Sequence, residues 1–127
     1  METRSVKTGD GLHLLFVCTM GRDRSYTAAR WYHGLNGIDA RYGGAHPHAH
    51  VPITREAMEW ADRIITFEPH HQASLTQHFG GLPHVPMVCL EIRNWYQRDS
   101  PLLRTRIAQE MARVCPDLPA FDGIQRG

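Results

Sequence analysis

The sequence predicts a single α/β domain, built as a four-stranded parallel sheet with helices on both faces. Three observations lead to this prediction. The chain has 127 residues, which is the size of one domain. Its composition, 42% apolar and 21% charged residues, is typical of a globular protein with a buried core. Short apolar runs alternate along the chain with segments of helical periodicity, and this alternation favours parallel strands joined by right-handed crossovers.

Four segments are predicted as strands. Residues 13–18 form a short apolar run, HLLFVC. Residues 63–68 and 86–92 have the same character and a similar length, so all three are expected to be buried. Residues 38–42 lie between two glycine-containing turns and form a fourth, less apolar candidate.

Helical patterns occupy the intervals between these strands. Apolar residues three and four apart predict helices over 25–35 and 53–60. Residues 69–79 begin with a proline, which a first helical turn tolerates because its missing N–H would have no partner there. The pattern over 100–114 is the clearest, with Ser100 as the predicted cap. Its apolar stripe consists of Leu103, Ile107, Met111 and Val114. Residues 116–127 are expected to be irregular.

The segment after the first strand carries the strongest chemical signal. It reads CTMGRDRS over residues 18–25, that is, a cysteine, five residues, Arg24 and Ser25. A loop around a helix start points N–H groups at one spot and adds the positive end of the helix dipole, which suits a phosphate. At this position Cys18 is favoured as a thiolate, which is the nucleophilic form. Arg24 can donate hydrogen bonds to two phosphate oxygens, and Ser25 can donate one to the sulfur. The other predicted phosphate-binding residues are Thr19, Met20, Gly21, Arg22 and Asp23.

The alternative is a buried structural Cys18 and a surface Arg24. The position of the motif, directly after a strand and directly before a helix, favours the functional interpretation over this one. In parallel sheets, ligands bind beyond the carboxyl ends of the strands, where this segment is expected.

The chain resembles the low-molecular-weight protein tyrosine phosphatase family, most closely its short bacterial phosphatase-like branch, over roughly residues 12–114. The matching segments are LLFVCTMGRDRSYTAA at 14–29, GIDARYGGAHPHA at 37–49 and ITREAMEWADRIITFEPHH at 53–71. The resemblance implies the strand order 2-1-3-4 and hydrolysis of a phosphate monoester through a phosphocysteine. It assigns Cys18 as nucleophile, Arg24 as phosphate clamp and Ser25 as loop hydroxyl, and it implies no cofactor.

Two parts of the family pattern differ here. The family loop usually reads C-x-G-N-x-C-R-[ST], whereas Gly21 and Asp23 occupy the asparagine and second cysteine positions. Asp23 beside a dianion costs Coulomb energy unless it turns away or pairs with Arg22. The family takes its general acid from a late Asp-Pro pair. The corresponding late loop here is residues 93–101, RNWYQRDSP, and Asp99 is its only carboxylate. Asp99 is therefore the candidate acid, a helix-start charge is its alternative role, and Glu91 is the reserve acid.

Aromatic residues near the motif are candidates for a substrate rim. Tyr26, Trp95 and Tyr96 are unusual for exposed loops, and aromatic walls would suit an aryl phosphate. Packing against the core is the alternative role for all three. The rim prediction implies a substrate that is a phosphorylated protein or a small aryl phosphate.

Histidines are clustered in two loops. His46, His48 and His50 alternate without a neighbouring carboxylate or cysteine, so we expect a solvated loop and no metal. His70 and His71 follow the third strand at a helix start. Both are expected at the surface.

Charge and hydropathy exclude other classes of function. The chain has 14 Lys+Arg and 13 Asp+Glu, a net charge of +1, and so no basic excess for nucleic acid. Its longest apolar run, 14–18, is too short for a membrane span. Residues 1–4 lack the layout of a signal peptide, and the three cysteines have no C-x-x-C spacing. We therefore expect a cytoplasmic protein.

The expected function is a cysteine-dependent phosphomonoesterase that acts on phosphotyrosine. A phosphate-binding or phosphoprotein-binding module without turnover is the first alternative. A thiol-based arsenate reductase is the second, and it would need Cys89 or Cys115 close to Cys18.

Overall fold

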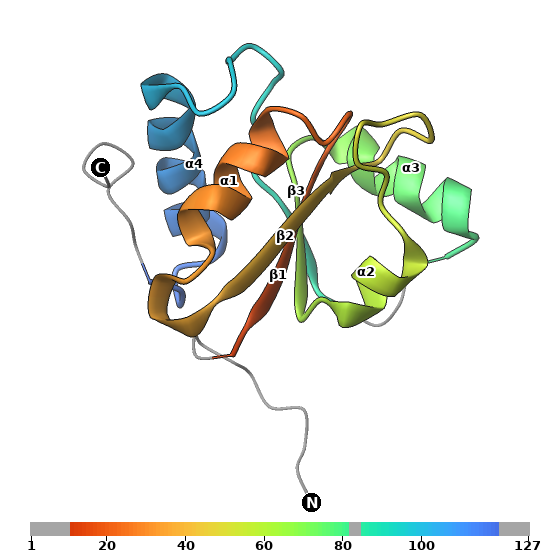
Figure 1. Cartoon of the computed structure of the whole chain (residues 1–127), viewed down its shortest axis with the longest axis horizontal. Helices are drawn as coiled ribbons and strands as arrows, with labels where there is room; N and C mark the ends of the chain where they lie inside the picture. Colours follow the sequence, from red (N-terminus) through yellow and green to blue (C-terminus); the bar gives the residue numbers. More distant parts are fainter. Residues whose placement is uncertain (1–10, 82–84, 120–127) are drawn as a thin grey trace, which may run out of the picture.

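The computed structural model describes residues 11–81 and 85–119. It is an α/β structure with one parallel sheet in the order β2-β1-β3-β4 (Figure 1). The predicted fold class and strand order are therefore confirmed. The strands are β1 His13–Cys18, β2 Asp39–Gly44, β3 Arg63–Thr66 and β4 Met87–Cys89. The helices are α1 Arg24–Tyr32, α2 Arg55–Trp60, α3 Pro69–Phe79 and α4 Pro101–Val114, with a short 3-10 helix at Leu35–Gly37.

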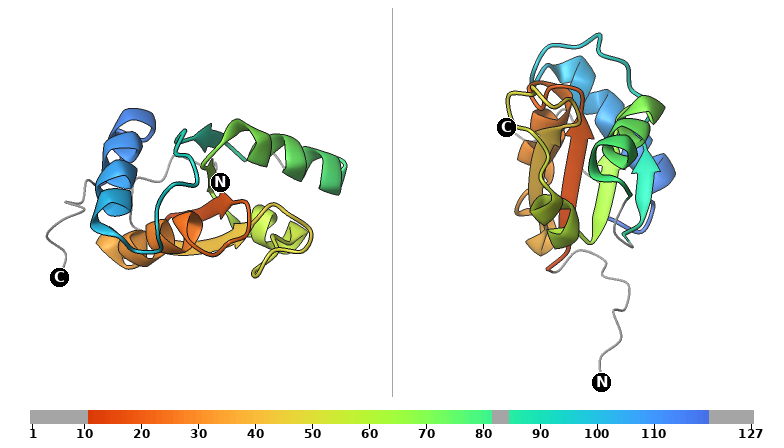
Figure 2. Two further views of the ribbon diagram at one scale, coloured as in Figure 1. Left: turned by 90° about the horizontal axis from the view of Figure 1, so that it is seen from above. Right: turned by 90° about the vertical axis from the view of Figure 1, so that its right-hand side faces the viewer.

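Helices cover both faces of the sheet (Figures 1 and 2). Alternate residues of β1 point to opposite faces, so Leu14 and Phe16 pack with α1 and α4, whereas Leu15 and Val17 pack with α2 and α3. β1 is buried on both faces because it lies between β2 and β3. This central position explains why residues 13–18 read as a continuous apolar run rather than an alternating one.

Three strands differ from their predicted bounds because pairing, not apolar character, defines them. β3 ends at Thr66, before the predicted residue 68, because its ladder with β1 ends there. β2 extends to Gly44 because Gly43 and Gly44 pair with Val17 and Cys18. β4 has only three residues, since its ladder with β3 runs from Ile64 to Thr66. The predicted strand was longer, 86–92, because Leu90 and Ile92 continue its apolar character. Both residues are buried in the core, but they lie after the end of β4.

The helix boundaries follow local capping signals. α3 and α4 have the predicted bounds, and the Ser100 hydroxyl accepts a hydrogen bond from the Leu103 N–H. α1 stops at Tyr32, before the predicted end, because Gly34 has a left-handed φ of 89°. Within the described ranges, no helix has both the length and the apolarity needed to cross a membrane. Residues 116–119 form a turn, and the rest of the predicted irregular segment, 120–127, and the N-terminal residues 1–4 lie outside the described residues.

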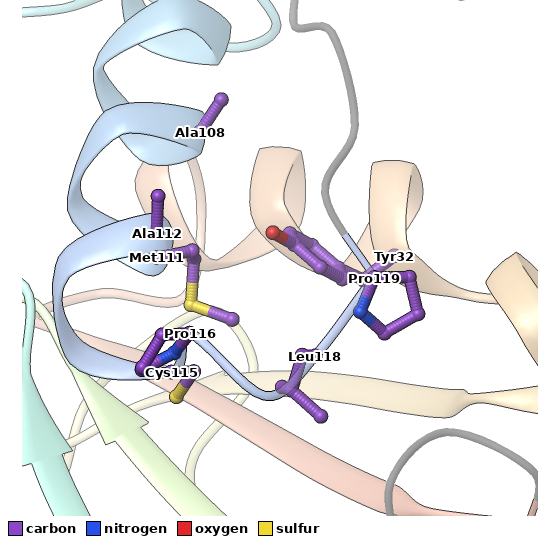
Figure 3. A pocket seen from close by; sticks show the side chains of 8 residues that line it. All are labelled: Tyr32, Ala108, Met111, Ala112, Cys115, Pro116, Leu118 and Pro119. Carbon is purple, nitrogen blue, oxygen red and sulfur yellow. The ribbon is translucent and has the colours of Figure 1, made fainter.

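A small pocket of about 120 Å³ lies between α1, α4 and the turn that follows α4 (Figure 3). Its lining is mostly apolar: Tyr32, Ala108, Met111, Ala112, Cys115, Pro116, Leu118 and Pro119. Burial raises the pKa of the Tyr32 phenol, with the Cys115 thiol adding to the effect, so this side chain is neutral. Cys115 contacts Arg63, the first residue of β3, which places the pocket at the amino end of the sheet.

Candidate active site

The predicted phosphate loop lies at the carboxyl end of β1. Cys18 is the last residue of β1, and α1 begins at Arg24, so the loop joins the central strand to a helix N-terminus. The helix macrodipole and the free N–H groups of the first turn favour an anion at this point. The fold therefore places the motif where the sequence predicts a ligand.

Hydrogen bonds orient the peptide planes of this loop. The carbonyls of residues 18–20 accept hydrogen bonds from the backbone N–H groups of Ala45, His46 and His50, at 2.8, 3.0 and 3.0 Å. In a planar trans peptide the N–H points opposite to the carbonyl. The N–H groups of residues 19–21 therefore point away from the 45–50 segment. This arrangement leaves them free to converge on an anion.

Glycines allow the loop to lie against β2. Gly21 has a φ of 67°, and a Cβ there would lie 2.8 Å from backbone atoms of Gly43 and Gly44. A Cβ on Gly44 would approach Met20 and Thr19 backbone atoms to 2.5 Å. Gly21, which departs from the family pattern, is thus required here by both its conformation and its surroundings.

Cys18 and Ser25 meet inside the loop. The Cys18 Sγ and Ser25 Oγ atoms are 3.1 Å apart, and both residues are buried. A hydroxyl at this distance can donate to a thiolate and stabilise it. Cys18 also lines a pocket of about 190 Å³, which is the space available to a ligand. The lining residues are Cys18, Met20, Arg22, Asp23, Arg24 and Asn94.

Arg24 is buried, with only 1% of its surface exposed. Its Nη1 donates to the Glu68 carboxylate and to the Ile92 carbonyl, both at 2.7 Å. Its Nη2 makes only a long contact, 3.4 Å, with the Thr19 hydroxyl. Its Nε is buried and has no acceptor among the described residues. A buried N–H without a partner is costly, so the Nε and Nη2 edge of the guanidinium is suited to an anion with two oxygens.

Glu68, which the sequence analysis did not single out, holds Arg24 in place. Burial alone would raise the pKa of its carboxyl, but the hydrogen bonds and charges of Arg24 and His70 outweigh burial and lower it. Glu68 is the N-cap of α3 and was predicted to be the end of a strand. Its position after β3, next to β1 in the sheet, is the signal that could have identified it.

The expectation of a surface position is wrong for His71, which is 0% exposed, whereas His70 is exposed. The Glu68 N–H donates to His71 Nδ1 at 3.0 Å, so the ring proton is on Nε2 and is donated to the Thr19 hydroxyl at 2.9 Å. Burial and the positive charges of Arg24 and His70 lower the pKa of His71 to about 3. His71 is therefore neutral near pH 7, and its hydrogen bond to Thr19 holds the phosphate loop against the start of α3.

Asp99, the candidate general acid, is oriented away from the pocket. Its carboxylate accepts a hydrogen bond from Trp31 Nε1 at 2.7 Å and pairs with Arg30, so both oxygens are bound to α1. Its own N–H donates to the Thr27 hydroxyl at 2.7 Å. The structure thus gives Asp99 its alternative role at the start of α4, where it ties the late loop to α1. Glu91, the reserve acid, is exposed and does not line the pocket either.

The three predicted rim aromatics do not line the pocket. Tyr26 lies edge-on to Tyr42, with the Arg98 guanidinium 4.3 Å from its ring centroid. Tyr96 packs against the core, as the alternative prediction had it. Trp95 is 74% exposed beside the pocket residue Asn94. Asn94 is the late-loop residue that reaches the site, and no sequence signal distinguished it.

Asp23 lines the pocket and lies near Arg22, one of the two arrangements that the sequence analysis gave for limiting repulsion of a dianion. The Arg22 Nε lies 3.7 Å from a carboxylate oxygen of Asp23. The side chain of Asp23 is 26% exposed. Although Asp23 is the N-cap of α1, its side chain makes no capping hydrogen bond. Its carboxylate is therefore not committed to the helix.

The other two cysteines are distant from Cys18. β3 separates β1 from β4, so two strand spacings, about 10 Å, lie between Cys18 and Cys89. Cys115 caps α4 near Arg63, at the opposite end of the sheet. A disulfide needs Cα atoms within about 7 Å, so neither cysteine can pair with Cys18 without backbone movement. This geometry does not favour the arsenate reductase alternative.

Glu68, His70 and His71 form one group of potential metal ligands, with ligand atoms within 4.8 Å of one another. However, the Glu68 carboxylate pairs with Arg24, and the free lone pair of His71 accepts the Glu68 N–H. The group does not suit a cation, because its acceptors are already bound and a guanidinium lies beside it.

Comparison of the chain with protein-family models, curated proteins and solved structures gave no match.

Proposed function

We propose that this protein is a cysteine-dependent phosphomonoesterase that resembles the low-molecular-weight protein tyrosine phosphatases. The observation that carries the proposal is the buried Arg24, which lines the Cys18 pocket and whose Nε has no hydrogen-bond partner among the residues that the structure describes. A guanidinium oriented from behind by Glu68, with its other edge open, is prepared for a tetrahedral oxyanion. The strand order and the position of the loop after β1 support the same family.

The proposed reaction has two steps. In the first, the Cys18 sulfur attacks phosphorus, an S–P bond forms, and the bond from phosphorus to the leaving oxygen breaks. Arg24 and the N–H groups of residues 19–21 stabilise the equatorial oxygens. In the second step water attacks phosphorus and the S–P bond breaks. The Ser25 hydroxyl, 3.1 Å from the sulfur, stabilises the departing thiolate.

The proposed substrates are phosphotyrosine in a phosphorylated protein or a small aryl phosphate. The exposed Trp95 supports this choice: it does not line the pocket, but it follows the pocket residue Asn94 in the chain, and an exposed tryptophan is suited to an aromatic or peptide partner. All three cysteines are free, which suits a reducing compartment, and we place the enzyme in the cytoplasm.

Hydrolysis of 4-nitrophenyl phosphate by the purified protein tests the proposal. Cys18→Ser should abolish turnover and retain phosphate binding. Arg24→Lys keeps the positive charge that pairs with Glu68 but loses the guanidinium group, which can donate two parallel hydrogen bonds to one phosphate. This variant should bind phosphate at least tenfold more weakly. Mass spectrometry of acid-quenched wild type should detect a phosphate adduct on Cys18. Equal turnover by wild type and Cys18→Ser would refute the proposal.

A phosphate-binding module without turnover is the second candidate. The orientation of Asp99 favours it, because the late loop then supplies no proton donor. In that case the wild type binds inorganic phosphate through Arg24, but it hydrolyses no aryl phosphate and forms no adduct on Cys18. The same assay therefore separates the two candidates.

A further inference from the structure

The proposed reaction needs a proton at the leaving oxygen, and the late loop does not provide it. Asp99 is bound to Arg30 and Trp31, and Glu91 is outside the pocket. Of the described residues that line the pocket, Asp23 is the only carboxylate. A positioned acid typically contributes about 10²–10⁴-fold to such a reaction, so its identity matters for turnover.

The backbone of Asp23 is fixed on both sides, whereas its carboxylate is not. The Asp23 carbonyl accepts hydrogen bonds from the N–H and the hydroxyl of Thr27, at 3.0 and 2.7 Å. The preceding carbonyl, of Arg22, accepts from Arg98 Nε at 2.7 Å. The carboxylate itself makes no capping bond, and among the described residues its ion-pair partner is the Arg22 guanidinium, at 3.7 Å. A pocket-lining carboxylate on a fixed backbone, without a capping bond, is available as a proton donor.

From this arrangement we propose that Asp23 is the general acid of the reaction, an inference that rests on the proposed function. When the Cys18 sulfur attacks phosphorus, the protonated Asp23 carboxyl transfers its proton to the leaving oxygen, and the P–O bond breaks. The Asp23 carboxylate then takes a proton from the water that attacks the phosphocysteine. The S–P bond breaks, and inorganic phosphate leaves with Asp23 protonated again.

The same placement explains why a carboxylate is tolerated beside an anion site. An ionised Asp23 would repel a phosphate dianion. Arg22 on one side and Arg24 on the other limit the repulsion. The Asp23 carboxylate makes no hydrogen bond to the N–H groups of α1, as a capping side chain would, and it therefore stays available to a ligand in the pocket.

A series of aryl phosphates with leaving phenols of increasing pKa tests the proposal. In the wild type the rate should vary little across the series, because the acid compensates for a poor leaving group. Asp23→Asn should slow phenyl phosphate about 10²–10⁴-fold and slow a dinitrophenyl ester much less. Asp99→Asn, run in parallel, should keep the shallow wild-type dependence on the leaving group. A steep dependence in Asp99→Asn and a shallow one in Asp23→Asn would overturn the inference.

A binding measurement keeps the inference testable if turnover is absent. Asp23→Asn removes a like charge from the pocket, so inorganic phosphate should bind several-fold more tightly than to the wild type near neutral pH. Unchanged affinity would place the carboxylate away from the ligand and overturn the inference. Asp23→Ser, with thermal unfolding of each variant, replaces Asp23→Asn if that variant does not fold. If Arg24→Lys loses phosphate binding and neither Asp23 variant has an effect, the proposed phosphate site is supported. Only the assignment of Asp23 as general acid is then refuted.

Discussion

Arg24 is held by interactions that use only part of its guanidinium group. Glu68 and the Ile92 carbonyl bind Nη1, and the Thr19 hydroxyl makes a long contact with Nη2. The residues that orient Arg24 therefore follow β1, β3 and β4. Because Arg24 is 1% exposed, these partners replace the water that would otherwise surround its guanidinium group.

Glu68→Gln should weaken binding of inorganic phosphate by about tenfold, because Arg24 loses the charged partner that fixes it. The pKa of Glu68 is lowered in the folded state, so its ion pair contributes stability above the ordinary glutamate range. This contribution is lost as pH falls through the lowered folded value. The stability difference between wild type and Glu68→Gln should thus be present at pH 7 and vanish in strong acid. Urea titrations at several pH values check this, and a constant difference would contradict it.

Cys18 should be the most reactive of the three cysteines towards iodoacetamide. Its sulfur lines a pocket at a helix N-terminus, whereas burial raises the pKa of the Cys115 thiol. Inorganic phosphate should protect Cys18 and leave Cys89 unaffected. Peptide mapping by mass spectrometry measures the three rates. Slowest labelling at Cys18, or no protection by phosphate, would contradict the nucleophile assignment.

At the scale of elements, the loop depends on its contact with β2. Gly21→Ala adds a methyl group that meets the Gly43 and Gly44 backbone at 2.8 Å, in addition to the cost of a φ of 67°. Gly34→Ala is a matched control, since Gly34 has a φ of 89° and nothing within 4 Å of the added carbon. Gly34→Ala should cost about 1–2 kcal/mol, from conformation alone.

Gly21→Ala should cost at least about 2 kcal/mol more than this control, and it should also impair phosphate binding. Denaturant unfolding and phosphate titration of both variants check the prediction. Equal losses of stability, with phosphate affinity retained in Gly21→Ala, would show that the loop does not need its packing on β2.

At the scale of the whole molecule, phosphate binding should stabilise the fold. The proposed ligand would bind Arg24, which Glu68 and the Ile92 carbonyl hold in place only when the chain is folded, so binding is expected only in the folded state. Stabilisation at a phosphate concentration of 100 times Kd should be about 2.7 kcal/mol. Thermal unfolding with increasing phosphate measures it, with sulfate and chloride as anion controls. Arg24→Lys should lose most of the shift, and an equal shift in that variant would mean that phosphate binds elsewhere.

Local sequence signals were sufficient for the elements and for the loop motif. The first residues of α3 and α4 follow from Pro69, Ser100 and Pro101, whose effects act within one helical turn. Residues 18–25 were identified because a strand, a loop and a helix start are contiguous there. The resemblance supplied the strand order that the structure confirms.

The partners of that motif were decided by tertiary structure. Arg24 binds Glu68 and the Ile92 carbonyl, which are separated from it by 44 and 68 positions in the sequence. These contacts form because β3 lies beside β1. His71 is buried rather than exposed because the end of β3 directs it at Thr19. Asp99 faces α1 instead of the pocket because α1 and α4 pack on the same face. Local propensity acts over a few residues, whereas these contacts depend on strand order and helix packing, which join segments that are distant in the sequence.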